Sequence, residues 1–85
     1  MSAPSVESTL RQYLVDELGL PSSITDESAL AESGMLVSAQ LLDLVVFVEE
    51  TFDVVLRPVD VLPEKMRSIR SIAEVIRERV ADAGR

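Results

Sequence analysis

The junction at Ser38, where a turn-rich segment gives way to an apolar stretch, constrains the fold of this chain most. Residues 20–37 are rich in Pro, Ser, Asp and Gly, which favour turns. Residues 38–52 place apolar side chains at the three-to-four spacing of a helix with a buried face. The Ser38 hydroxyl can cap this helix by accepting a hydrogen bond from a backbone N–H two or three residues on. We therefore expect a long loop that leads into an apolar helix.

The helix over residues 38–52 carries both an apolar stripe and acidic groups. Its expected inward residues are Leu41, Leu42, Val45, Val48 and Phe52. Further apolar residues widen this surface: Leu44, Val46 and Phe47. A wide apolar surface implies burial on two sides, or exposure that a partner could use. Acidic residues lie at the polar edge and at the C-terminal end, where the helix dipole disfavours them unless a basic partner binds: Asp43, Glu49, Glu50 and Asp53.

Three further helical elements are expected. Ser5 caps a helix over about residues 6–18, which Gly19 ends by tolerating positive φ. Pro58 begins a short element with core contacts from Val59, Val61, Leu62 and Met66. Ser68 caps a last helix over about residues 69–82. Its inward residues should be Ile69, Ile72, Ala73, Ile76 and Val80, and an outward ion-pair face should comprise Arg70, Glu74, Arg77, Glu78 and Arg79.

Length and composition favour one small all-α domain over residues 1–85. Apolar residues of the long loop should anchor it to the core: Leu20, Ile24, Leu30 and Leu36. The absence of Cys excludes disulfides and thiolate metal sites, and the absence of His removes the usual general base. Ser38 is therefore better suited to be an attachment point than a nucleophile.

Charge is distributed unevenly along the chain. Residues 1–56 carry ten Asp or Glu against a single Arg, whereas residues 57–85 carry seven basic and five acidic residues. The acidic part would repel nucleic acid and attract basic proteins. The longest apolar run, residues 44–48, is too short to span a membrane, and the N-terminus has no signal-peptide pattern. We expect a soluble, cytoplasmic monomer.

These segments together resemble the acyl carrier and peptidyl carrier protein family over nearly the whole chain. Residues 30–38 read Leu-Ala-Glu-Ser-Gly-Met-Leu-Val-Ser, where the family has a Leu-x-x-Ser-Gly-x-Leu-Asp-Ser type of segment. Residues 41–52 follow the family's Leu-Leu-x-Leu-Val-x-Phe-x-Glu-Glu-x-Phe helix, and the last helix opens with Ser and Ile. The details of residues 33–36 and 63–66 are similar to a stand-alone carrier of a dedicated pathway.

The resemblance implies a small four-helix bundle with a long loop between helices one and two and a short third helix. It implies that a phosphopantetheinyl transferase moves 4′-phosphopantetheine from coenzyme A to Ser38. A loading ligase would then place an acyl or aminoacyl group on the thiol of the arm for downstream biosynthetic enzymes. Acidic residues would meet basic docking patches on these enzymes: Asp43, Glu49 and Glu50. Apolar contacts near the arm would come from Met35, Leu36 and Leu42.

The modified serine of the family lies in Asp-Ser-Leu, whereas this chain has Val37-Ser38-Ala39. Val37 replaces a charge, and Ala39 replaces an apolar contact, on the surface that partners meet. A divergent carrier, an unmodified carrier-type interaction module and an altered sequence are each compatible with this departure. An enzyme is not expected, because Ser38 has no His to activate it and the chain contains no metal-ligand motif or phosphate loop.

Overall fold

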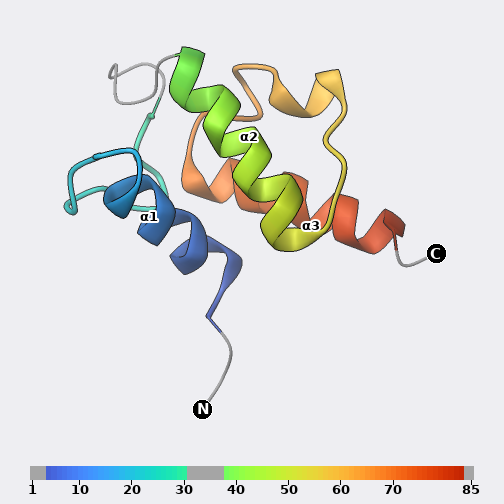
Figure 1. The fold of residues 1–85 in the computed structure, drawn as a ribbon, viewed down its shortest axis with the longest axis horizontal. Helices are drawn as coiled ribbons and strands as arrows, with labels where there is room; N and C mark the ends of the chain where they lie inside the picture. The colour runs from blue at the N-terminus through green and yellow to red at the C-terminus, as the bar shows by residue number, and fades with distance from the viewer. Residues whose placement is uncertain (1–3, 31–37, 84–85) are drawn as a thin grey trace.

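Three α-helices and one 3₁₀ turn make up the described part of the chain in a computed structural model (Figure 1). The structure describes residues 4–30 and 38–83, with Ser38 by its backbone alone. The elements are α1 (Val6–Asp16), α2 (Ser38–Phe52), the 3₁₀ turn η1 (Pro58–Val61) and α3 (Ile69–Ala83). No strand occurs in these ranges. The all-α class is confirmed, and the expected short third helix is a single 3₁₀ turn.

Helix α3 forms the centre of the molecule because both α1 and α2 pack against it. Its buried residues are Ile69, Ile72, Ala73, Val75 and Ile76. The sequence predicted four of these and missed Val75. Val80 was predicted inward but is 47% exposed. Figure 1 shows the reason, since the last turns of α3 extend past the end of α2.

The ends of α1 follow from local hydrogen bonds. Ser5 caps the helix as predicted, and its Oγ accepts a hydrogen bond of 3.0 Å from the Ser8 N–H. The helix ends about two residues earlier than predicted, because the N–H groups of both Glu17 and Leu18 donate to the Tyr13 carbonyl. Gly19 then takes a φ of +74°, a conformation that favours glycine. The cap predicted at the start of α3 is also present, since Ser68 Oγ accepts from the Ser71 N–H at 3.2 Å.

The segment after α1 is anchored by apolar side chains and by backbone hydrogen bonds. Leu20, Ile24 and Leu30 are buried, as the sequence predicted, whereas Leu36 lies outside the described residues. The Leu30 N–H donates to the Arg67 carbonyl at 2.9 Å, and the Arg70 N–H donates to the Asp26 carbonyl at 3.0 Å. These bonds fix the segment against the start of α3 and satisfy backbone groups that burial would otherwise leave unpaired.

In and after the turn η1, the residues that face the core differ in part from those predicted. Val59 and Leu62 are 52% and 43% exposed, so their prediction as core contacts is wrong. Asp60 is buried instead, and its carboxylate accepts a hydrogen bond of 2.8 Å from the Arg57 N–H. This carboxylate occupies the inward position of the short turn, which directs the neighbouring apolar residues outward. Met66 is buried as predicted, and Val61 packs partly against the core.

Candidate functional site

Helix α2 buries a narrower stripe than its sequence suggests. Leu44 and Val48 are each only 1% exposed, whereas Leu42 is 69% exposed. The prediction that Leu42 faces inward is therefore wrong, and Leu44 belongs to the core. At about 100° per residue, Leu44 and Val48 point to one side of the helix and Leu42 points well away from them. The apolar residues of α2 are thus divided between the core and the surface.

The predicted site includes a side of α2 that points away from the core, which we call the outer face of α2. Its exposed residues are Ala39, Leu42, Asp43, Val46 and Glu50. Their spacing of three and four residues places them on one side of the helix. Leu42 and Val46, one turn apart, form an apolar strip with carboxylates beside it. Sequence analysis placed Val46 on the widened apolar surface of this helix but did not single it out beside Leu42, although its i+4 spacing from Leu42 was a usable signal.

Glu49, one of the acidic residues predicted to meet partners, accepts a hydrogen bond from the backbone of this chain. Its Oε2 accepts a hydrogen bond of 2.9 Å from the Leu56 N–H, and its side chain is partly buried. The Val54 N–H also donates to the Glu49 carbonyl at 3.3 Å, next to Asp53 with a φ of +54°. Glu49 therefore stabilises the turn after α2, whereas the side chains of Asp43 and Glu50 are exposed.

Ser38 is the first residue of α2, at the end of the helix where the dipole is positive. Backbone N–H groups at such an end have no partner within the helix and favour a phosphate group. Three other predicted site residues lie outside the described residues: Met35, Leu36 and Val37.

The ion-pair face predicted along α3 is present only in part. Arg79 pairs along the helix with Glu78, as predicted, and with Asp82, whereas Arg70 and Arg77 pair with other elements. Arg77 donates two hydrogen bonds to Glu7 of α1, at 2.8 and 2.7 Å. These bonds lower the pKa of Glu7 to about 2. Arg70 pairs with Glu27 of the long loop. Arg79, predicted outward, has a side chain only 13% exposed and lies 3.8 Å from the Asp60 carboxylate, measured from Nε to Oδ2.

The described residues contain no group of three or more acidic side chains placed to hold a metal ion. None of the helices in the ranges 4–30 and 38–83 has the length and apolarity to cross a membrane. Comparisons with known proteins find no matching family model and no matching curated protein.

Proposed function

We propose that this chain is a stand-alone acyl or aminoacyl carrier protein of the four-helix carrier type, with 4′-phosphopantetheine attached to Ser38. The observation that carries the proposal is the position of Ser38 at the N-terminus of α2, next to an exposed apolar and acidic face of the same helix. The motif resemblance around Ser38 supplies the identity of the arm. The chain contains no Cys, so the arm would provide the only thiol.

In this proposal the protein's own residues attach, position and present the cargo. The Ser38 oxygen would form a bond to phosphorus while the bond between the two phosphates of coenzyme A breaks, with 3′,5′-ADP leaving and the serine proton passing to the transferase. The bound arm supplies a thiol that holds the cargo as a thioester. Leu42 and Val46 would give apolar contacts to partner enzymes, and Asp43 and Glu50 would attract basic patches and raise the rate of encounter.

The test is the intact mass of the protein after incubation with coenzyme A and a broad-specificity phosphopantetheinyl transferase. We expect a gain of one phosphopantetheine in the native chain and none in Ser38→Ala. Ser23→Ala is the matched control, because Ser23 is an exposed serine of the long loop and its loss should leave the gain intact. No gain in the native chain would contradict the proposal.

A second candidate function is an unmodified helical module that binds basic protein partners. The Val37-Ser38-Ala39 sequence favours it, because the family's acidic residue before the serine is missing. Val37→Asp separates the two functions. A gain of mass in this variant alone would mean a carrier fold that transferases no longer recognise, and the unmodified module would then be the better conclusion.

Charge reversal tests the docking role of the outer face of α2. Asp43→Lys with Glu50→Lys should slow cargo transfer at low salt, because both carboxylates are exposed and would meet basic patches. Glu64→Lys with Glu74→Lys reverses two exposed charges elsewhere, changes net charge by the same amount and should have a smaller effect. Equal slowing in both variants would assign the effect to net charge. Glu49 is unsuitable for this test because its reversal would also remove the hydrogen bond from Leu56.

A further inference from the structure

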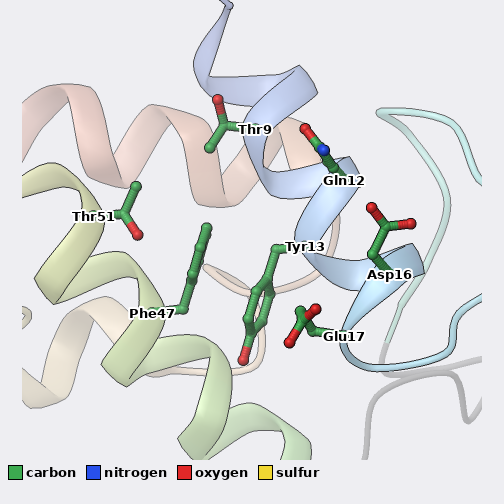
Figure 2. A pocket seen from close by; sticks show the side chains of 7 residues that line it. All are labelled: Thr9, Gln12, Tyr13, Asp16, Glu17, Phe47 and Thr51. Carbon is green, nitrogen blue, oxygen red and sulfur yellow. The ribbon is translucent and has the colours of Figure 1, made fainter.

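A hollow of about 280 Å³ lies between α1 and α2, on a side of α2 different from its outer face. Figure 2 shows this hollow and the side chains that surround it. Its lining residues are Thr9, Gln12, Tyr13, Asp16, Glu17, Phe47 and Thr51. All seven come from α1, its C-cap or α2, and none is basic. None of them belongs to the site around Ser38.

Two aromatic rings bridge the helices at this hollow. Tyr13 of α1 and Phe47 of α2 stack with ring centroids 3.9 Å apart and planes 15° apart. Phe52 meets the Phe47 ring edge-on, at a centroid distance of 6.5 Å. The stacked rings seen in Figure 2 therefore have a fixed orientation and give the hollow an apolar, aromatic wall.

The hollow also carries an uncompensated negative charge. Asp16 is the last residue of α1 and Glu17 is its C-cap, where the helix dipole adds to the negative potential. Neither carboxylate forms an ion pair within the described ranges, whereas Glu7, Asp26 and Asp60 each pair with an arginine. Burial, followed by the charges of Asp43 and Glu17, raises the pKa of Tyr13. The aromatic wall thus lies in a field that favours a cation.

We propose that this hollow receives the guanidinium group of an arginine from a partner protein. A guanidinium is planar and weakly hydrated, so it can lie against aromatic rings while its N–H groups donate to carboxylates. The compact, strongly hydrated ammonium of lysine fits this combination less well. An anion would be repelled by Asp16 and Glu17. The proposal does not rest on the modification of Ser38 and concerns the unmodified chain equally.

The probe is the blocked tripeptide acetyl-Gly-Arg-Gly-amide, titrated into ¹⁵N-labelled protein and followed by NMR. We expect saturable shifts at the lining residues, with dissociation at least about fivefold weaker for the lysine analogue and for the uncharged citrulline analogue. Equal binding of the arginine and citrulline peptides would overturn the proposal. Shifts spread evenly over all acidic surfaces would overturn it as well.

Matched double variants separate the hollow from net charge. Asp16→Asn with Glu17→Gln should weaken peptide binding at least about fivefold, since charge-assisted hydrogen bonds are lost. Glu64→Gln with Glu74→Gln removes the same charge from exposed residues away from the hollow and should change binding little. Equal weakening in the two variants would contradict a defined site. All four residues are exposed, so neither variant should disturb the fold.

Tyr13 provides a second readout, because it is the only tyrosine and the chain has no Trp. A bound guanidinium would offset the charges that raise the pKa of Tyr13, so ultraviolet absorbance should show tyrosine ionising at lower pH with the arginine peptide present. The citrulline peptide should leave the ionisation unchanged. The same pKa of Tyr13 with and without saturating arginine peptide would place the guanidinium elsewhere and refute the proposal.

Discussion

Single charged groups hold the elements of this protein together across long sequence separations. Asp60 is only 4% exposed and faces Arg79, whose side chain is almost as buried. Burial alone would raise the pKa of Asp60, but the hydrogen bond from the Arg57 N–H and the charges of Arg57 and Arg79 outweigh it, and the pKa is lowered. The carboxylate is therefore kept ionised where it connects η1 to α3.

Asp60→Ala should lower the free energy of unfolding by about 1–3 kcal/mol, because the Arg57 N–H loses its buried acceptor. Arg79 loses one partner but keeps its ion pair with Asp82 at 3.0 Å. Urea unfolding at neutral pH measures this change. Glu64→Ala is the control, since removal of an exposed carboxylate should change stability by less than about 0.5 kcal/mol. A similar small loss in both variants would show that the contacts of Asp60 contribute little.

The ion pair between Glu7 and Arg77 should make the free energy of unfolding depend on pH in the acid range. The pKa of Glu7 is about 2 in the folded protein and near 4.5 in the unfolded chain, so its stabilisation is present above about pH 4.5 and is lost as pH falls towards 2. Solvent screening at the exposed Arg77 keeps this stabilisation small. Glu7→Gln should thus be less stable at pH 7, and its difference from the native chain should vanish near pH 2. A constant difference across this pH range would exclude the charge of Glu7 as the cause.

At the scale of elements, the apolar residues of α2 are divided between a side that packs in the core and a side that is exposed. One side of the helix packs into the hydrophobic core through Leu44 and Val48. The outer face of α2 exposes Leu42 and Val46, where a soluble helix usually has polar residues. Exposed apolar residues at one-turn spacing do not stabilise the isolated domain, and they suit contact with a partner.

Alanine substitutions should separate the two surfaces of α2. Leu44→Ala should cost about 2–5 kcal/mol of unfolding free energy, because it leaves a cavity in the core. Leu42→Ala removes the same atoms from an exposed position and should change stability by less than about 0.5 kcal/mol. Chemical unfolding of the two variants under identical conditions makes the comparison. Comparable losses would mean that Leu42 is buried in solution.

At the scale of the molecule, α3 is the element on which the other helices depend. Both α1 and α2 pack against it, and the arginines of α3 pair with Glu7 of α1 and Glu27 of the long loop. A domain of this size has a total stability of only about 4–13 kcal/mol. Loss of packing on α3 should therefore affect all helices together.

Ile72→Ala, at a fully buried position of α3, should lower stability by about 2–5 kcal/mol while unfolding stays cooperative. Circular dichroism reports all the helices, and Tyr13 fluorescence reports the contact between α1 and α2. The two signals should give the same, lower denaturant midpoint. Separate midpoints would show that α1 and α2 hold together without α3.

Local patterns were enough to predict the helices and part of the candidate site. The span of α2 over residues 38–52, the cap at Ser5 and the positive φ of Gly19 are confirmed. Each depends on groups within about four residues along the chain, which the sequence displays directly. Asp43 and Glu50, predicted to meet partners, are exposed, and their role stays a prediction.

Tertiary structure decided which residues of each helix face the core and which distant groups meet. The apolar residues of α2 surround most of the helix, so only its packing against the rest of the core selects Leu44 over Leu42 as a core residue. Likewise, Asp60 became an inward carboxylate because Arg79 lies opposite it. The sequence by itself determined the elements, since backbone hydrogen bonds and caps are local. The contacts between those elements, and the hollow between α1 and α2, form only when the helices pack and bring distant side chains together.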